Sequence, residues 1–406
     1  MTLSTPLRVI PEPRAARAAV AALFFTNGAI LANLLPRYPQ LKADLGLSNA
    51  EYGLAVAAFP SGALVAGLAA GAIIRRFRSA RVAVAGTMLT SLGILAAALA
   101  PSWAGLTAGL FVAGCMDAIT DVAQNAHGLR VQRLYGRSIL NTLHATWSVG
   151  AVVGGLMGGF AAGIELPRGI HLSLSALLFT AVSLTALRFT LPGPEPEDLA
   201  EPAPGPVDAP APRRVPTRPI WLTITALVLV AGGGILVEDS GMTWAAVYLN
   251  GTLGAEAAVA SFGFVALVGA QFVGRLLGDG LVDRFGQRAV ARAGGATTAL
   301  GMGMALLFPS IAGTIVGFAF AGFGVATLVP AAMHGADELP GLRPGTGLTV
   351  VSWLMRLGFL LSPPIVGHVA DAFGLRVGLL VVPFAGTLVL LAAGVLSAVR
   401  APEHRK

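Results

Sequence analysis

The sequence predicts an all-α membrane protein with twelve transmembrane helices arranged as two six-helix bundles. Three observations support this fold class. Hydrophobic residues make up 55% of the 406 positions and charged residues only 12%, with a mean hydropathy of +0.76. Long apolar segments recur along the whole chain. Lysine and arginine collect in alternate connections between these segments, as they do in multi-pass membrane proteins.

Each apolar segment is long enough to cross about 30 Å of hydrocarbon as a helix. The 52 glycines agree with this, because membrane helices pack closely through small residues. In order along the chain, we expect spans at residues 18–36, 51–74, 82–100, 103–127, 138–163, 169–189, 220–249, 257–280, 289–309, 311–334, 345–367 and 376–398.

The basic residues predict the topology. Of the 27 lysines and arginines, 21 fall on the side of the membrane that holds both termini, and four fall on the opposite side. The positive-inside rule then places both termini in the cytoplasm. The positive-inside distribution therefore accounts for the net charge of +7, and we expect no binding to nucleic acid. The remaining two basic residues, Arg275 and Arg356, lie inside predicted helices.

A proline-rich segment divides the chain. Residues 192–219 hold ten prolines and several acidic residues, a composition typical of a solvated linker. The expected organisation is a cytoplasmic tail at 1–17, a bundle at 18–190, a linker at 191–219, a second bundle at 220–398 and a tail at 399–406.

The two halves repeat at an offset of 208 residues, which predicts that they are duplicates. The matching residues fall on corresponding helices. They are Ala113-Gly114 with Ala321-Gly322, Gly150 with Gly358, and Gly159 with Gly367.

The connection after the eighth span carries a family resemblance. Residues 278–288 resemble the Asp-Arg-x-Gly-x-Arg loop signature of the major facilitator superfamily. The residues concerned are Asp279, Asp283, Arg284, Gly286 and Arg288. The first-half copy departs from the family, because it has Arg75 where an aspartate is usual. In addition, residues 143–150 are similar to a bacterial branch related to fucose permeases.

The resemblance implies alternating access, in which two bundles rock around a central cavity lined mainly by spans 1, 4, 7 and 10. Spans 3, 6, 9 and 12 would lie on the outer side of the bundles, away from the cavity. The charge pattern agrees with this arrangement, because these four outer spans contain no acidic residue between their ends. Ionisable residues inside helices fall on spans 4, 5, 7, 8 and 11 instead.

The fourth span has a polar face. Its members are spaced for one side of a helix: Asp117, Thr120, Asp121, Gln124 and Asn125. Two carboxylates one turn apart repel each other, which favours keeping one of them protonated. Asp117 and Asp121 are therefore candidates for proton coupling, with Gln124 and Asn125 as cavity residues. The alternative is a structural pair bonded to a basic loop such as 75–81.

The seventh span carries two adjacent acids, Glu238 and Asp239, after the glycine triplet at 232–234. A carboxylate at this depth is costly unless it is paired or protonated. We expect Glu238 to couple protons or contact substrate, and Asp239 is also a candidate for proton coupling. The alternative is an ion pair with a base of the eighth or eleventh span. The glycine triplet would permit a local helix break.

Further candidates for the cavity are polar or aromatic residues within helices. Arg356 and Trp353 lie one turn apart, as do His144 and Trp147. Arg356 can hold a substrate anion or neutralise Glu238. His144 can titrate near neutral pH, and the alternative is a packing residue. The others are Asn27, Asn33, Arg37 and Trp244. At the end of the eighth span, Arg275 and Asp279 predict a gate ion pair that includes Asp283.

The fifth span contains closely spaced glycines that resemble the glycine motif of proton-linked drug antiporters. They are Gly150, Gly154, Gly155, Gly158 and Gly159. The alternative, which we favour, is close packing between helices.

The sequence contains no phosphate-binding loop, metal-ligand cluster or catalytic triad, so we expect neither an enzyme nor a cofactor. The leading hypothesis is a monomeric, proton-coupled secondary transporter of a small solute in the bacterial inner membrane. A drug exporter is the alternative within transport. A membrane sensor or assembly partner that no longer transports is the alternative of another class.

Overall fold

A computed structural model describes residues 13–136, 139–193, 220–337, 339, 342 and 346–396. Within these residues the regular elements are helices and no strand occurs, which confirms the all-α class. Most of the predicted N-terminal tail and linker, and all of the predicted C-terminal tail, lie outside the described residues.

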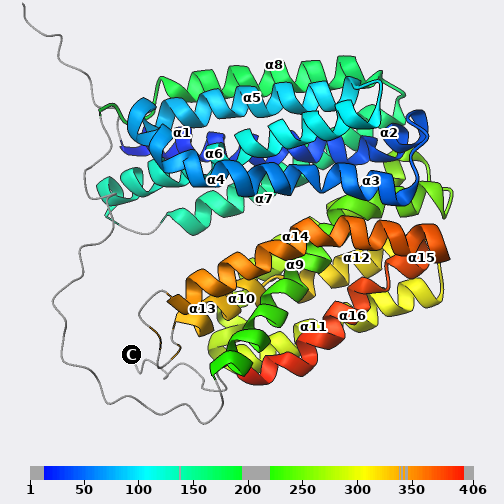
Figure 1. The fold of residues 1–406 in the computed structure, drawn as a ribbon. Coiled ribbons are helices and arrows are strands. Elements are labelled where there is room, and N and C mark those ends of the chain that lie inside the picture. The colour runs from blue at the N-terminus through cyan, green and yellow to red at the C-terminus, as the bar shows by residue number, and fades with distance from the viewer. Residues whose placement is uncertain are drawn as a thin grey trace, which may run out of the picture.

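The first six spans form one bundle, drawn in the upper half of Figure 1. Two of them are broken into consecutive helices. In chain order they are α1 (Pro13–Leu34) with η1 (Leu35–Arg37) and α2 (Tyr38–Asp44), α3 (Asn49–Val56) with α4 (Ala58–Phe77), α5 (Ser79–Leu99), α6 (Trp103–Tyr135), α7 (Leu140–Gly163) and α8 (Arg168–Leu187).

The last six spans form a second bundle, in the lower half of the same view (Figure 1). Two of these are also interrupted. They are α9 (Ile220–Gly251), α10 (Ala257–Phe285), α11 (Gln287–Leu307), α12 (Ile311–Val325) with α13 (Leu328–Asp337), α14 (Thr346–Phe373), and α15 (Leu375–Gly378) with α16 (Val381–Ala392) and η3 (Ala393–Val395).

Eleven of these twelve spans are long and apolar enough to cross a membrane by composition alone. The twelfth is α11, which carries Arg292 together with several glycines and threonines. It nevertheless packs within the second bundle, where Gly294 lies against the backbone of Gly324 in α12 and Gly295 against that of Gly386 in α16. The twelve-helix prediction is therefore confirmed.

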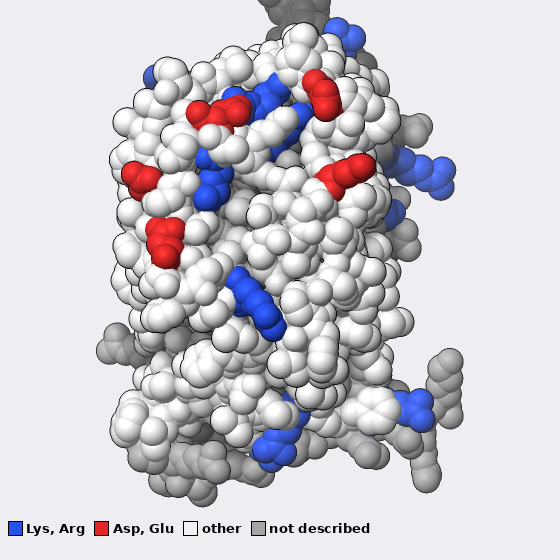
Figure 2. Space-filling model, turned by 90° about the vertical axis from the view of Figure 1, so that its right-hand side faces the viewer, with Lys and Arg blue, Asp and Glu red and all other residues white. Residues whose placement is uncertain are grey.

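The long axis of the molecule has two distinct ends. The described chain leaves the first bundle at residue 193 and enters the second at residue 220 at one end, which we call the linker end (Figure 1). The opposite end, which we call the far end, carries α2, α3 and α15. Figure 2 looks onto the far end and shows both acidic and basic side chains there.

Packing repeats between the bundles at the predicted offset. Ser102 and Ser310 each cap the helix that follows by accepting a hydrogen bond from a glycine N–H three residues on, at 3.3 and 3.1 Å. Gly114 lies against the carbonyl of Phe59, and Gly322 lies against the carbonyl of Leu267, the equivalent position. The duplication is therefore visible in three dimensions.

Candidate functional site

The far end is closed by contact between α3 of the first bundle and α14 of the second. The carboxylate of Asp371 accepts hydrogen bonds from the backbone N–H groups of Asn49 and Ala50, both at 2.8 Å. Gly53 lies against the carbonyl of Pro363, and Gly367 against that of Asn49, so closely that neither position has room for a Cβ. These small residues allow the two backbones to meet.

Aromatic side chains extend this closure beneath the surface. Tyr52 of α3 donates a hydrogen bond to the carbonyl of Thr243 in α9 at 2.8 Å. Its ring packs edge-on against those of Trp244 and Tyr38, with centroids 5.0 and 5.5 Å apart. Trp244, predicted as a cavity residue, has no exposed surface and therefore belongs to the contact between the bundles.

Asn27 of α1 organises the polar residues of the first bundle. Its Nδ2 donates to Oδ1 of Asp117 at 2.8 Å. Its Oδ1 accepts from Trp147 Nε1 at 2.8 Å and from Gln124 Nε2 at 3.3 Å. One amide therefore joins α1, α6 and α7, which brings together four candidate residues from three different helices.

Asp121 lies one turn further toward the linker end and is exposed. Its carboxylate accepts from Asn125 at 3.0 Å and from Gln124 at 3.4 Å. Arg356 of α14 lies close enough to act on this carboxylate electrostatically, and Arg275 of α10 acts likewise on His144 of α7. Charged groups of the two bundles therefore face each other in the middle of the molecule.

The second bundle holds Glu238 near the middle of α9. Its Oε2 accepts a hydrogen bond from Gln271 of α10 at 2.7 Å and lies 3.8 Å from an Arg275 guanidinium nitrogen. The ion pair with the eighth span, offered by the sequence as the alternative role of Glu238, is thus present. We call Asn27, Asp117, Asp121, Gln124, Asn125, His144, Trp147, Glu238, Gln271, Arg275 and Arg356 the central polar cluster.

Asp239, adjacent to Glu238, does not join the central polar cluster. It is buried beside Ser362 of α14, and its Oδ2 has no hydrogen-bond partner among the described residues. The helix break permitted by the glycine triplet does not occur, because α9 is continuous from Ile220 to Gly251. Gly233 and Gly234 instead make room for Val389 and Leu328.

Two predicted cavity residues lie within the first bundle instead. Asn33 contacts α8 through His171 at 3.0 Å and Ser175 at 3.2 Å. Arg37 is fully buried and donates to the carbonyl of Leu166 at 2.8 Å and to Gln40 at 3.0 Å. Both side chains therefore stabilise contacts within that bundle in this conformation.

Trp353, the other aromatic cavity candidate of the second bundle, is 60% exposed on α14. It lies one turn from Arg356, which is also exposed.

The predicted gate pair is not formed in this conformation. Among the described residues, Asp279 and Asp283 make no ion pair, because Arg275 reaches the partly buried carboxylate of Glu238 instead. Gly286 has a φ of 82°, a conformation that favours glycine, and Arg288 donates to the carbonyl of Leu396 at 2.9 Å. Arg284 lies over the ring of Phe285. In this conformation the residues of the loop signature therefore set the backbone turn and its packing, and they do not form a gate.

The glycines of α7 are occupied by helix packing on two faces. Gly150, Gly154 and Gly158 lie against backbone carbonyls of α1. Gly155 and Gly159 lie against Phe264 and Ser261 of α10, in the other bundle. This second contact closes the far half of the interface beside α3 and α14, and it matches the packing alternative for these glycines.

Several residues of the site and the closure were not predicted. Gln271 has a recognisable signal, since it lies one turn before Arg275 in an otherwise apolar segment. Asp371, Tyr52 and Ser362 have none, because each makes its contact with a residue more than 100 positions away. No group of three metal-ligating side chains occurs in the described part of the chain.

Comparison with known proteins gives consistent matches along nearly the whole chain. The sequence model of the Major Facilitator Superfamily matches residues 20–279 and 239–406. An uncharacterised transporter of Sinorhizobium fredii is 28% identical over 93% of this chain and 97% of its own. The membrane protein MosC of Rhizobium meliloti is 28% identical over 92% of this chain and 88% of its own.

Solved structures share the fold at low sequence identity. The nucleoside transporter NupG superposes with a TM-score of 0.74 at 12% identity, covering 93% of this chain and 99% of that one. A D-xylose–proton symporter superposes with a TM-score of 0.64 at 16% identity, covering 94% and 96%. The twelve-helix architecture described above is therefore a known transporter fold.

Proposed function

Because the chain belongs to the Major Facilitator Superfamily, we propose that it moves a small polar or amphipathic solute by alternating access, driven by protons. The chain is a multi-pass membrane transporter of this superfamily and not an enzyme. Proton coupling and the class of solute are the proposal.

The arrangement around Glu238 carries the proposal for coupling. An ionised Glu238 attracts Arg275 and accepts from Gln271, so it holds α9 against α10. Protonation removes the negative charge and with it the attraction for the guanidinium. Arg275 is then available to another partner, for which Asp279 and Asp283 on the same helix are candidates. Proton binding thereby changes which groups hold the second bundle together.

The first bundle supports a second proton-binding position. Asp117 and Asp121 are one turn apart, and Asp117 is tied to the Asn27 amide. A solute that enters the central polar cluster would meet carboxylates, the His144 imidazole and the Arg356 guanidinium, with indole rings at Trp147 and Trp353. Such a surface suits a solute with several hydrogen-bonding groups and one apolar face.

The names of similar folds agree with a small polar solute. They include a nucleoside transporter and a proton symporter of D-xylose, although their low identity supports the fold alone. The finer similarity to the branch related to fucose permeases stays a prediction.

We further propose that the protein is monomeric in the bacterial inner membrane with the linker end in the cytoplasm. The 21-to-4 distribution of basic residues supports this orientation. In that orientation, contacts of α3 with α14 and of α7 with α10 close the periplasmic half in the conformation described here.

The alternatives are a drug exporter and a protein that senses without transporting. The exporter rested on the glycines of α7, whose positions are accounted for by packing against α1 and α10. The sensor predicts that the carboxylates of the central polar cluster can be neutralised without consequence.

Reconstitution tests the proposal. Solutes that raise the thermal unfolding midpoint of the purified protein are first selected from a metabolite and drug library, since a ligand of the native state stabilises it. Their movement into proteoliposomes is then measured with and without an imposed pH gradient. We expect at least one selected solute to accumulate only with the gradient. Movement that ignores the gradient would refute proton coupling, and no movement of any selected solute would favour the sensor.

A further inference from the structure

An apolar groove lies between the two bundles, outside the central polar cluster. It has a volume of about 790 Å³. The first bundle contributes α3, the first turn of α4 and the first three turns of α6, and the second bundle contributes the middle of α14. In Figure 1, α3 and α4 run beside α14 along the line where the bundles meet. The lining residues are Leu54, Ala57, Ala58, Ser61, Trp103, Ala104, Thr107, Ala108, Phe111, Val112, Leu360, Leu361 and Pro364.

Small side chains make the groove deep. Four of the lining residues are alanines, and two of these, Ala57 and Ala58, are buried. The larger side chains of Leu54, Val112 and Leu361 are exposed. The alanines therefore form the floor of the groove, and the larger apolar side chains form its rim.

The polar side chains of the groove already have partners within the protein. Ser61 donates to the carbonyl of Ala57 at 2.7 Å, and Thr107 donates to that of Trp103 at 2.8 Å. The indole N–H of Trp103 donates to the carbonyl of Glu51 at 2.8 Å. A water molecule needs two or more polar partners to be held in a cavity. The groove thus favours an apolar occupant over water.

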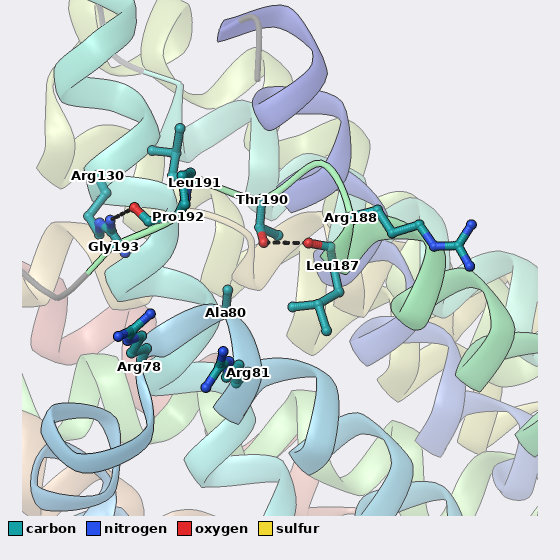
Figure 3. Close-up of a pocket in the computed structure, with 10 residues that line it drawn as sticks. All are labelled: Arg78, Ala80, Arg81, Arg130, Leu187, Arg188, Thr190, Leu191, Pro192 and Gly193. Carbon is teal, nitrogen blue, oxygen red and sulfur yellow. Dashed lines mark hydrogen bonds between the residues drawn. The ribbon is translucent and has the colours of Figure 1, made fainter. Parts of the chain in front are cut away.

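The pocket at the linker end has a different chemical character. Figure 3 shows Arg78, Arg81 and Arg130 around that pocket, at the start of α5 and the end of α6. None of the thirteen residues that line the groove is charged. An ionic ligand therefore finds no counter-charge among the groove residues, which again favours an apolar one.

The length of the groove matches one leaflet of a bilayer. Trp103 is the first residue of α6 and lies at the far end, where it bonds Glu51 of α3. Val112 is nine residues further along α6, so the groove extends about 14 Å into the membrane at 1.5 Å per residue. Half of a hydrocarbon core of about 30 Å is about 15 Å. Trp103 also suits the mouth of the groove, because tryptophan is enriched at the level of the lipid headgroups.

We propose that this groove binds one acyl chain of a phospholipid from the leaflet at the far end, and that the chain stabilises the closed far end. An empty groove would leave its walls without packing contacts, and an acyl chain is the apolar group that the membrane supplies at this depth. The chain lies lengthwise along α6, with its headgroup beside Trp103.

The groove continues the contact that closes the far end. Leu54 follows Gly53, and Pro364 follows Pro363, whose carbonyl Gly53 touches. A chain in the groove contacts α3 and α6 on one side and α14 on the other, so opening of the far end would separate its two walls. Binding therefore favours the closed conformation. This effect on opening rests on the proposed alternating access, whereas binding of the chain does not.

Photochemical crosslinking in a bilayer tests the proposal. The full chain is reconstituted in phosphatidylcholine that contains a small fraction of phosphatidylcholine with a photoactivatable diazirine in one acyl chain. Adducts are mapped by mass spectrometry after illumination. We expect residues 103–112 and 360–364 to carry several-fold more adducts than the exposed face of α5 in the same leaflet, formed by Leu92, Ala96 and Leu99. Equal labelling of the groove and of this face would overturn the proposal.

Two variants fill the groove. Ala104→Phe and Ala108→Phe each place a ring where the chain would lie, so the groove adducts should be lost. Ala96→Phe is the matched control, because it adds the same ring to an exposed alanine of α5 outside the groove. It should keep the wild-type adducts. Both filled variants should keep the wild-type unfolding midpoint, so that the loss reports filling and not unfolding. Groove adducts that persist in both filled variants would overturn the proposal.

Gly53→Ala tests the link to closure. A Cβ at this position would overlap the carbonyl of Pro363 and separate α3 from α14, so adducts on 360–364 should fall. Unchanged adducts there would overturn the claim that the chain stabilises the closed far end. These measurements use neither a transported solute nor a pH gradient. Their failure would therefore leave the proposed transport function standing, and failure of transport would leave the lipid site standing.

Discussion

The carboxylate of Asp371 in the second bundle caps the first turn of α3 in the first bundle by accepting from the N–H groups of Asn49 and Ala50. A helix start leaves its first N–H groups without intrahelical partners, and an acidic side chain is a favoured acceptor for them. Here the acceptor comes from 322 residues away in sequence. The bonds exist only while the far end is closed, so they contribute directly to the balance between two conformations.

Replacing Asp371 by alanine should shift this balance toward opening of the far end. Loss of a helix cap costs about 1 kcal/mol, which corresponds to roughly a fivefold change in the ratio of the two states. Spin labels at Ala43→Cys and Phe373→Cys, in a Cys115→Ser background, report the distance between the bundles at this end. Glu256→Gln, an exposed acid at the same end, is the control. An unchanged distance distribution in Asp371→Ala would show that the cap does not hold this end closed.

Gly53 makes a second prediction about the same closure. A Cβ at this position would overlap the carbonyl of Pro363, so Gly53→Ala should separate α3 from α14 and populate the longer distance. Gly67→Ala is the matched control, because a Cβ there meets no atom within 4 Å. It should leave the distances unchanged and stabilise α4 by about 0.5–1 kcal/mol. Equal behaviour of the two variants would contradict the role of close backbone contact.

Replacing Asn27 should lower the stability of the protein. Asn27→Ala removes the acceptor of Trp147 and Gln124 and the donor to Asp117. A buried group left without its partner costs about 1–3 kcal/mol, so the unfolding midpoint should fall by several degrees. Asn125→Ala, which affects only exposed hydrogen bonds to Asp121, should cost clearly less. A larger loss in Asn125→Ala would mean that Asn27 does not organise this bundle.

The spans and the duplication could be predicted from the sequence because their signals are local. Hydropathy identifies each helix, and residues such as Gly114 and Gly322 keep their spacing when a half is duplicated. α11 is instructive, because Arg288 and Arg292 near its start lower its apolar character although the helix packs against α12 and α16. The sequence thus predicts helices well even where two charged residues weaken the hydrophobic pattern.

Which polar residues meet is harder to predict. The polar face of α6 was recognised from its spacing, but α1 is buried on both faces. The sequence therefore could not tell that Asn27 joins the central polar cluster, whereas Arg37 of η1 bonds Leu166 in the connection between α7 and α8. For Arg275, two acids on its own helix competed with Glu238 on another. Only the fold reveals that the partly buried carboxylate is nearer.

The most direct test of the account is solute movement by Glu238→Gln in proteoliposomes. Glutamine keeps a hydrogen bond to Gln271 possible but cannot be ionised, so the protonation change at this position is removed. We expect gradient-driven accumulation to be abolished, whereas exchange of internal for external solute continues, because exchange needs no net proton movement. Glu256→Gln should accumulate solute as the wild type does. Accumulation by Glu238→Gln at the wild-type level would contradict the assignment of Glu238 as the coupling residue.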